Sequence, residues 1–302
     1  MNKIIIHEVG LRDGLQMEKE IVPTGQKAKW LRNLAASGID IIQIGSFVHP
    51  ERVPQMADTD ELFRQMTKSM SKPENVIFSG LVLNERGLER GLSCGVEMFC
   101  MGVSASETHS RKNTRMTTKE ALHRIIAMAN LALQEKKEVQ VSVQSAFGCG
   151  YEGVVPEKSV VEIVEAYVNA GLKNISLADT AGHANPAQVE QLFGTIFKLD
   201  SAIECTCHFH NTYGMALANC YAALQTGVTS FESSFGGLGG CPFTAVAGGN
   251  VCTEDLVLML QQMQMRRDTD LDKLIEIAKD ASQFFKRDLP GSIYKSGPIP
   301  QA

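Results

Sequence analysis

Residues 156–178 read PEKSVVEIVEAYVNAGLKNISLA and contain one complete unit of the fold. Apolar side chains recur at spacings of three and four over residues 156–170, which predicts an amphipathic helix. Gly171 follows this helix, and glycine is well suited to the left-handed position that ends many helices. Residues 174–178 then form a short apolar run, which is typical of a parallel strand covered on both faces.

The same alternation of strand and helix extends along the chain in both directions. Strand-like runs rich in Ile, Val and Phe occupy residues 3–9, 39–45, 75–83, 97–103, 138–144, 174–178, 203–208 and 230–234. Helix-like segments occupy residues 25–37, 59–70, 85–93, 118–136, 156–170, 186–199, 215–226 and 250–263, with an extra one near 271–285. Eight strand–helix pairs in this order predict an α/β protein, a (β/α)8 TIM barrel with an extra C-terminal helix.

A doubly wound sheet is the main alternative fold. Such a sheet normally has fewer strands and often carries a GxGxxG sequence in its first turn, whereas residues 10–14 read GLRDG. No linker, repeat or low-complexity block divides the chain. We therefore expect residues 1–302 to form a single TIM-barrel catalytic domain, in which residues 264–302 make a C-terminal helical extension.

Composition narrows the classes of protein. The 302 residues are 44% hydrophobic and 21% charged, which excludes a disordered or collagen-like chain. A net charge of −5 argues against nucleic acid and against an anionic membrane surface as partners. No apolar run approaches the roughly 20 residues that span a bilayer. His7 and Glu8 come too early for a signal peptide, so we expect a cytoplasmic protein.

The eight cysteines include no CxxC pair, and most of them stand in apolar stretches. We therefore expect reduced, mostly buried thiols rather than disulfides.

The strongest local signal for chemistry is the pair His208 and His210, at the end of the seventh strand-like run. Side chains two apart on a strand share a face, so both imidazoles can reach one metal ion. Two surface histidines are the alternative. Asp13 and Asn250 follow the first and eighth runs, and a closed barrel brings those ends close to the seventh. This mixed nitrogen and oxygen set suits Mg²⁺ or Mn²⁺, with Zn²⁺ and Co²⁺ also open.

Four further features at the predicted strand ends each have two interpretations. Arg12 is either a surface ion-pair residue or a cation that stabilises an enolate oxygen. Asp179 is either a helix N-cap or a ligand for the substrate. Residues 236–242 carry four glycines and Cys241, which makes the segment either a plain turn or a mobile loop whose thiol donates a proton. Residues 106–113 are either a solvated loop or, through an Arg-Lys pair, a binding site for cofactor phosphates.

Nearly the whole chain resembles one known family, the 3-hydroxy-3-methylglutaryl-CoA lyases, within a larger group of metal-dependent TIM-barrel lyases and Claisen synthases. The matching motifs are residues 8–16 (EVGLRDGLQ), 46–48 (SFV), 54–56 (PQM), 148–153 (GCGYEG), 208–214 (HFHNTYG), 237–242 (GLGGCP) and 253–256 (TEDL). The Arg-Asp pair and the two histidines belong to the wider group. The glycine-rich loop that ends in Cys-Pro points to the lyase branch.

The resemblance implies a role for each candidate residue. The divalent cation, Mg²⁺ or Mn²⁺, would be bound by Asp13, His208, His210 and Asn250. Arg12 would stabilise the enolate, Cys241 would assist proton transfer, Asp179 would contact the acyl group, and the segment that ends at Asn113 would help hold CoA. The implied reaction is a retro-Claisen cleavage of a 3-hydroxyacyl-CoA to acetyl-CoA and a keto acid. Partners are then small molecules, with a homodimer possible because related barrels often pair.

Three residues depart from the family pattern. Gln43 stands where the family has a catalytic Glu, and Gln140 stands where it has an active-site Arg. Asn211 replaces a usual Asp. Because loss of one buried charge alone would leave the other unbalanced, we hypothesise that the first two changes are coupled and that Gln43 and Gln140 line a rebuilt substrate pocket.

Three functions remain open at this point. Hydroxymethylglutaryl-CoA is the default substrate of such a lyase, and a citramalyl-CoA-like substrate is the nearest variant. A Claisen synthase or aldolase of the same group is a second possibility, which the Cys241 loop disfavours. A weakly catalytic metal- or acyl-CoA-binding protein is the third.

Overall fold

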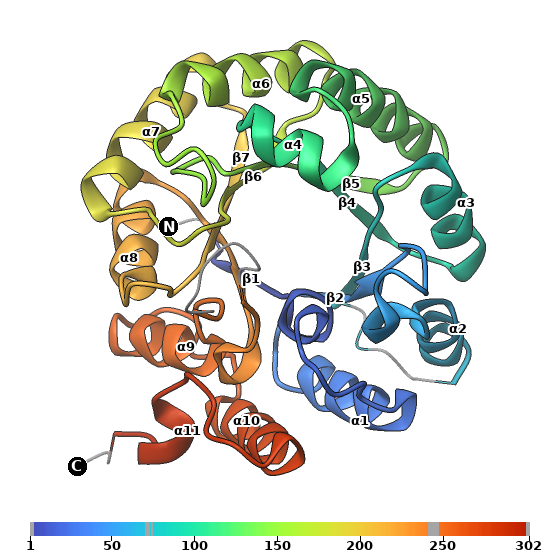
Figure 1. The fold of residues 1–302 in the computed structure, drawn as a ribbon. Coiled ribbons are helices and arrows are strands. Elements are labelled where there is room, and N and C mark those ends of the chain that lie inside the picture. The colour runs from blue at the N-terminus through green and yellow to red at the C-terminus, as the bar shows by residue number, and fades with distance from the viewer. Residues whose placement is uncertain (1–2, 70–72, 74, 241–247, 300–302) are drawn as a thin grey trace.

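The computed structural model describes residues 3–69, 73, 75–240 and 248–299. Eight parallel strands close into a barrel in the order of the sequence, and helices surround it (Figure 1). The strands are β1 (Ile5–Glu8), β2 (Ile41–Ser46), β3 (Ile77–Leu81), β4 (Met98–Ser104), β5 (Glu138–Gln144), β6 (Asn174–Asp179), β7 (Glu204–Phe209) and β8 (Ser230–Ser233). The predicted TIM barrel is therefore confirmed.

The helices lie around the barrel and over its mouth, and most of them bury an apolar face against the strands or against one another (Figure 1). They are α1 (Thr24–Ala35), α2 (Thr59–Ser69), α3 (Glu85–Cys94), α4 (Glu107–Thr114), α5 (Thr118–Gln134), α6 (Glu157–Asn169), α7 (Pro186–Leu199), α8 (Ala216–Thr226), α9 (Thr253–Gln262), α10 (Leu271–Phe285) and α11 (Ile293–Ser296). Short turns η1 (Gly10–Gly14), η2 (Pro54–Met56) and η3 (Phe235–Gly237) join some of them to the strands.

The extra C-terminal helix is α10, and it packs beside α1 (Figure 1). Trp30 of α1 is buried, and its Nε1 donates a hydrogen bond to Asp280 Oδ2 at 2.7 Å. The Trp30 ring also meets the ring of Phe284 edge-on, with centroids 5.7 Å apart. The amphipathic pattern of residues 271–285 thus corresponds to a helix that covers the flank of the first strand–helix unit.

Two predicted segments differ from the structure. Residues 106–113 were expected as a loop, but Ser106 caps a helix, α4, by accepting a hydrogen bond from His109 N at 3.1 Å. The helix lacks an apolar stripe, which is why periodicity did not reveal it. The eighth helix begins at Thr253 rather than at Asn250, because Asn250 instead forms an isolated β-bridge with His210.

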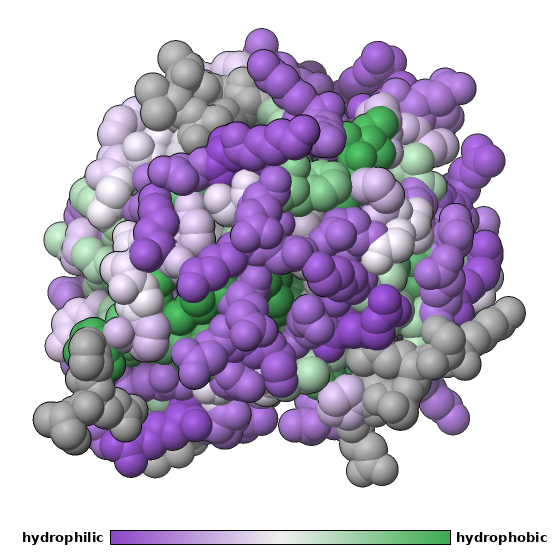
Figure 2. All heavy atoms as spheres, turned by 90° about the horizontal axis from the view of Figure 1, so that it is seen from below, coloured by the Kyte–Doolittle hydropathy of each residue, from purple (hydrophilic) through white to green (hydrophobic). Residues whose placement is uncertain are grey.

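The described cysteines are free and buried, as the sequence predicted, and Cys241 lies outside the described residues. They are Cys94, Cys100, Cys149, Cys205, Cys207, Cys220 and Cys252. Hydrophilic residues cover most of the face seen in Figure 2, and hydrophobic residues show only in small areas between them. Within the described part of the chain, no helix has the length and hydrophobicity needed to cross a membrane.

Candidate active site

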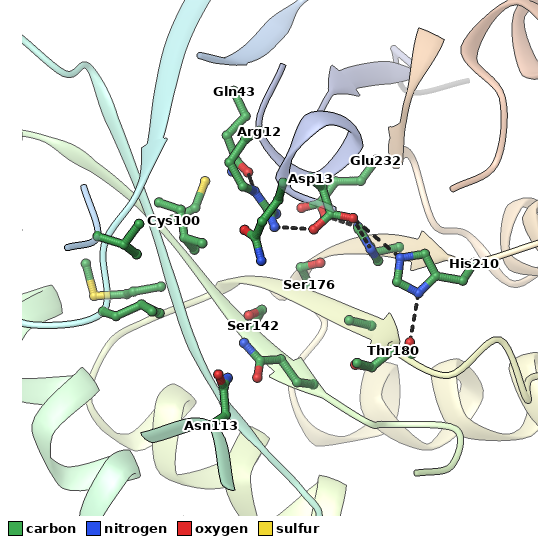
Figure 3. A pocket seen from close by; sticks show the side chains of 18 of the residues that line it. Arg12, Asp13, Gln43, Cys100, Asn113, Ser142, Ser176, Thr180, His210 and Glu232 are labelled. Carbon is green, nitrogen blue, oxygen red and sulfur yellow. Dashed lines mark hydrogen bonds and ion pairs between the residues drawn. The ribbon is translucent and has the colours of Figure 1, made fainter. Parts of the chain in front are cut away.

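A pocket of about 260 Å³ opens at the carboxyl ends of the strands, where TIM barrels bind their substrates (Figure 3). Its first wall is the turn η1, which follows β1 and presents Arg12 and Asp13. The turn is tight because the Val9 carbonyl accepts hydrogen bonds from Arg12 N and Asp13 N at 3.1 and 2.7 Å. Gly10 fits there because a Cβ atom on it would lie 2.5 Å from the Phe235 ring.

Asp13, His208 and His210 converge in this pocket. One potential ligand atom of each lies within 4.8 Å of the others. Asp13 Oδ2 is 3.4 Å from His210 Nε2 and 3.9 Å from His208 Nε2. The geometry therefore brings a carboxylate and two imidazoles together, as the spacing of the two histidines predicted, and it does not leave the histidines scattered on the surface.

Hydrogen bonds on the far side of each imidazole ring fix its tautomer. His210 Nδ1 donates to the Thr180 carbonyl at 2.9 Å, and His208 Nδ1 donates to Glu232 Oε2 at 2.6 Å. The Nε2 atom of each ring then faces Asp13. Metal-binding histidines in proteins are held in this way, since the outer bond orients the ring and raises its basicity.

Asn250 contacts the same carboxylate oxygen of Asp13 as His210 does. Its Nδ2 donates to Asp13 Oδ2 at 2.9 Å and to the Leu238 carbonyl at 3.1 Å. Its Oδ1 is buried and has no hydrogen-bond partner among the described residues. A buried acceptor without a partner is costly, and turning the amide over would direct this oxygen, in place of Nδ2, toward a cation bound beside Asp13. Asp13, His208 and His210 therefore fit a mixed nitrogen and oxygen metal site, and Asn250 lies beside them.

The charges of the cluster suit a cation. Burial alone would raise the pKa of Asp13, but the Arg12 guanidinium, the His210 hydrogen bond and the two imidazoles outweigh it and hold that pKa well below its ordinary value. Burial would likewise raise the pKa of Glu232, yet the hydrogen bond from His208 and the nearby positive groups lower it. Both carboxylates are consequently ionised at neutral pH.

Arg12 is held between a carboxylate and an amide. Its Nη1 donates to Asp13 Oδ1, and its Nε donates to Gln43 Oε1. Gln43 lies on β2 and is 1% exposed. The neutral amide thus orients the guanidinium by a hydrogen bond, where a carboxylate would also have added charge.

Gln140 and Gln43 lie close to one another through Cys100. Gln140 Nε2 donates to Thr206 Oγ1 at 3.1 Å, and the Cys100 thiol lies 3.8 Å from Gln140 Oε1. Gln43 also interacts with the Cys100 thiol. The two departures from the family pattern therefore both contact the Cys100 thiol, which supports the hypothesis that they are coupled.

The remaining predicted residues are divided between the pocket and the surrounding scaffold. Asn113 and His109 of α4 line the pocket. Asp179 is fully buried, and its carboxylate accepts hydrogen bonds from His183 N at 2.8 Å and Ala184 N at 3.1 Å. It does not cap the following helix, because Asn185 caps α7. Asp179 thus anchors the loop that also supplies the Thr180 carbonyl.

Arg111 and Lys112, the candidate phosphate-binding pair, contact neighbouring side chains. Asn211, the third departure from the family pattern, contacts the start of α8. Arg111 forms an ion pair with Glu107 at 2.8 Å, and Lys112 Nζ lies 4.5 Å from the centre of the Tyr151 ring. Asn211 Oδ1 accepts from Ala216 N at the start of α8, at 3.1 Å. Cys241 lies outside the described residues.

The sequence reasoning missed Glu232 and His7. In the barrel, Glu232 on β8 is the register partner of His7 on β1 and of His208 on β7. His7 is buried, its pKa is lowered to about 4 by burial, and its Nε2 lies 2.8 Å from Ser79 Oγ. Strand alternation could have revealed Glu232, because it places this side chain on the inward face of β8, opposite to the side chains of Phe231 and Ser233.

This arrangement defines a TIM barrel with a candidate divalent-cation site beside a guanidinium. A family model described as HMGL-like matches residues 3–280, and the chain belongs to that family. It is homologous to carbon–carbon lyases that act on acyl-CoA thioesters, as the resemblance of the sequence indicated.

Several relatives match over nearly the whole chain. The hydroxymethylglutaryl-CoA lyase YngG of Bacillus subtilis is 40% identical over 97% of this chain and 98% of its own. The (R)-citramalyl-CoA lyase of Chloroflexus aurantiacus is 35% identical over 99% of this chain and 96% of its own. Among solved structures, an HMG-CoA lyase from Acinetobacter baumannii in complex with coenzyme A and 3-methylmalate has a TM-score of 0.92 at 36% identity, covering 99% of this chain and 97% of that one.

Proposed function

We propose that this protein is a divalent-metal-dependent carbon–carbon lyase that cleaves a 3-hydroxyacyl-CoA to acetyl-CoA and a keto acid. Hydroxymethylglutaryl-CoA is the first candidate substrate. The observation that carries the proposal is the convergence of Asp13, His208 and His210 on one point beside Arg12. Asn250 would be the fourth ligand of Mg²⁺ or Mn²⁺.

The reaction requires transfer of the 3-hydroxyl proton to a general base, cleavage of the C2–C3 bond, and transient storage of its electron pair on the thioester as an enolate. A bound divalent cation supplies Lewis acidity that acidifies the hydroxyl group and orients it. Arg12 stabilises the enolate oxygen, because its guanidinium is fixed by Asp13 and Gln43 before the substrate arrives. Protonation of the enolate carbon then yields acetyl-CoA, and the former carbinol carbon becomes the ketone.

The roles of Cys241 and Asn113 follow from the family resemblance. Cys241 would assist proton transfer to the enolate carbon, and Asn113 on α4 would contact the CoA thioester at the pocket. Support for a CoA thioester comes from the Acinetobacter relative, whose structure holds coenzyme A.

A citramalyl-CoA-like substrate is the second candidate. Gln43 and Gln140 favour it, because they place two neutral amides where the family pattern has two opposite charges. A relative that is 35% identical is a citramalyl-CoA lyase. The two candidates share the metal site and Arg12 and differ only in where the acyl carboxylate lies.

The test is a mass-spectrometric assay of the purified protein with Mn²⁺ and either thioester. We expect acetyl-CoA together with acetoacetate from hydroxymethylglutaryl-CoA, or with pyruvate from citramalyl-CoA. Addition of EDTA should abolish both reactions. Binding of Mn²⁺ without turnover of either thioester, or of any other 3-hydroxyacyl-CoA, would instead favour a binding protein with little catalysis.

A further inference from the structure

The pocket has two chemically different sides. Nitrogen and oxygen atoms gather around Arg12, Asp13 and His210, whereas the side around Cys100 shows carbon and sulfur atoms (Figure 3). Four aliphatic residues line the pocket from the end of β3, from the residues just after it and from the segment after β2, and we call them the apolar wall. They are Val48, Val53, Leu81 and Leu83.

Leu81 and Leu83 lie outside the described hydrophobic core. Leu81 ends β3 and shares the face of Ser79, whose hydroxyl contacts His7 inside the barrel. Both leucines are only partly buried, and neither is among the described side chains that form the hydrophobic core or pack against it. Their apolar surface therefore faces the pocket, where a hydrophobic part of a ligand would remove it from water.

Among the described residues that line this side of the pocket, none carries a fixed positive charge that would balance an anion. The nearby lining residues from β5 and β6 are Gln140, Ser142, Gln144 and Ser176, all uncharged. Among the described lining residues, the one guanidinium is that of Arg12, which already contacts Asp13 and Gln43. His109 also lines the pocket, and burial lowers its pKa, which favours the neutral ring.

We infer that the apolar wall binds a hydrocarbon branch on the hydroxyl-bearing carbon of the substrate. The enzyme accordingly prefers 3-hydroxyacyl-CoA thioesters with an ethyl or propyl branch over those with hydrogen or methyl at that position. Any acyl carboxylate then lies on the side of Arg12 and the metal site, because a carboxylate against Leu81 and Leu83 would lose hydration without gaining a cation. This inference deepens the proposed function and rests on it.

The experiment uses a series of thioesters that share a 3-hydroxy-3-carboxyacyl-CoA core. The third substituent on C3 is hydrogen, methyl, ethyl, propyl or, as a charged counterpart of propyl, carboxymethyl. With Mn²⁺ present, kcat/KM should rise about fourfold for each added methylene up to propyl, the factor that burial of one methylene supplies. The carboxymethyl compound should fall at least about tenfold below the propyl compound, because its charge would be desolvated without a partner.

Variants of the apolar wall test whether these leucines cause the preference for longer branches. Leu81→Asn and Leu83→Asn should each flatten the dependence on branch length, while Leu83→Met should retain it. Leu131→Asn, at an exposed position of α5, is the matched control and should leave the series unchanged. The ratio of propyl to methyl kcat/KM within each variant cancels differences in the fraction of folded protein.

Two results would overturn the inference. One is a wild-type series that does not change with branch length, and the other is a preference that survives both asparagine variants. Calorimetric titration of the same thioesters separates this inference from the proposed function. A Kd that tightens from hydrogen to propyl without any cleavage would contradict the lyase and keep the hydrophobic subsite, whereas equal Kd values would reject the subsite even in an active lyase.

Discussion

The side of the pocket formed by β1, β7 and β8 differs sharply from the side formed by β3 and the segment after β2. On the first side, His208, His210 and Asp13 each have their ring nitrogens or carboxylate oxygens fixed by neighbours. On the second side, Leu81 and Leu83 contact the pocket and leave the core to other residues. The comparison suggests that the first side performs a reaction common to the family, while the second side can change with the substrate.

The largest expected effect comes from neutralising the charge at the centre of the first side. Asp13→Asn removes the carboxylate that faces both imidazoles and holds Arg12. We expect kcat/KM to fall by about 10³-fold or more, since a metal ligand and the partner of the guanidinium are lost together. Steady-state assays and Mn²⁺ titration by electron paramagnetic resonance would measure the two losses.

The matched control for this variant is Asp200→Asn, at a surface ion pair with Lys173. It should retain both activity and Mn²⁺ binding. If Asp13→Asn bound Mn²⁺ as tightly as the wild type, the assignment of the cation site would be wrong.

The next largest effect is on the pH dependence of stability, and it comes from Glu8, which is bonded to the turn that holds Arg12 and Asp13. Glu8 is buried, and its carboxyl group accepts hydrogen bonds from Gly10 N in the turn η1, from Phe235 N and from Thr253 Oγ1. Burial raises its pKa to about 8, whereas an unfolded chain ionises near the ordinary value of 4.5. Between these values the unfolded state binds fewer protons, so the free energy of unfolding falls as pH rises from about 4.5 to 8.

Glu8→Gln removes that proton and keeps the shape of the side chain. We expect its free energy of unfolding, relative to wild type, to increase by on the order of 2–4 kcal/mol between pH 4.5 and 8. Urea denaturation at several pH values measures this difference. Glu162→Gln, in an exposed pair with Lys158, should track the wild type, and parallel curves for wild type and Glu8→Gln would refute the account.

A smaller effect, on Mn²⁺ affinity, is expected from changing Glu232, which orients the His208 ring. Glu232→Gln weakens the acceptor for His208 Nδ1, so the ring loses the interaction that orients its Nε2. Affinity for Mn²⁺ should fall by about 10- to 100-fold, the range found when the outer partner of a metal-binding histidine is changed. Glu232→Asp should recover part of the lost Mn²⁺ affinity. If Glu232 had a purely structural role, Glu232→Gln would lower the thermal stability of the protein and leave its Mn²⁺ affinity unchanged.

The smallest expected effect lies at the border between the two sides. Gln43→Glu together with Gln140→Arg restores the opposite charges of the family pattern around Cys100. We expect about a tenfold gain in kcat/KM on hydroxymethylglutaryl-CoA, and a loss of stability for Gln140→Arg alone, because its buried charge would lack a partner. If the double variant gained nothing on this substrate, the two glutamines would not be coupled.

Much of the first side of the pocket, around the two histidines, could be predicted from the sequence. Little of the second side, around Leu81 and Leu83, could be predicted. Strand and helix periodicity was sufficient for the barrel, because each element buries one face against its neighbours. His208 and His210 could be recognised because their spacing matches the period of a strand. Glu232 could not be recognised as easily, since its importance comes from register with β1 and β7, which only the closed barrel defines.

The second side was missed for the same reason. Leu81 and Leu83 read as part of a buried strand, and the sequence alone does not show which aliphatic residues of an inward face remain at the pocket. The helix α4, which contributes His109 and Asn113, was expected as a loop because its stabilising signal is the Ser106 cap and not an apolar stripe.

The central claim is that the first side cleaves a carbon–carbon bond through an enolate. The most direct test is the Mn²⁺-dependent reaction of hydroxymethylglutaryl-CoA and of citramalyl-CoA in D₂O, with the mass of the acetyl-CoA product measured by mass spectrometry. The account predicts acetyl-CoA with one deuterium in its methyl group, because the enolate carbon takes its proton in the active site after cleavage. Release of free CoA with the acyl group intact, or no acetyl-CoA from any 3-hydroxyacyl-CoA, would contradict it.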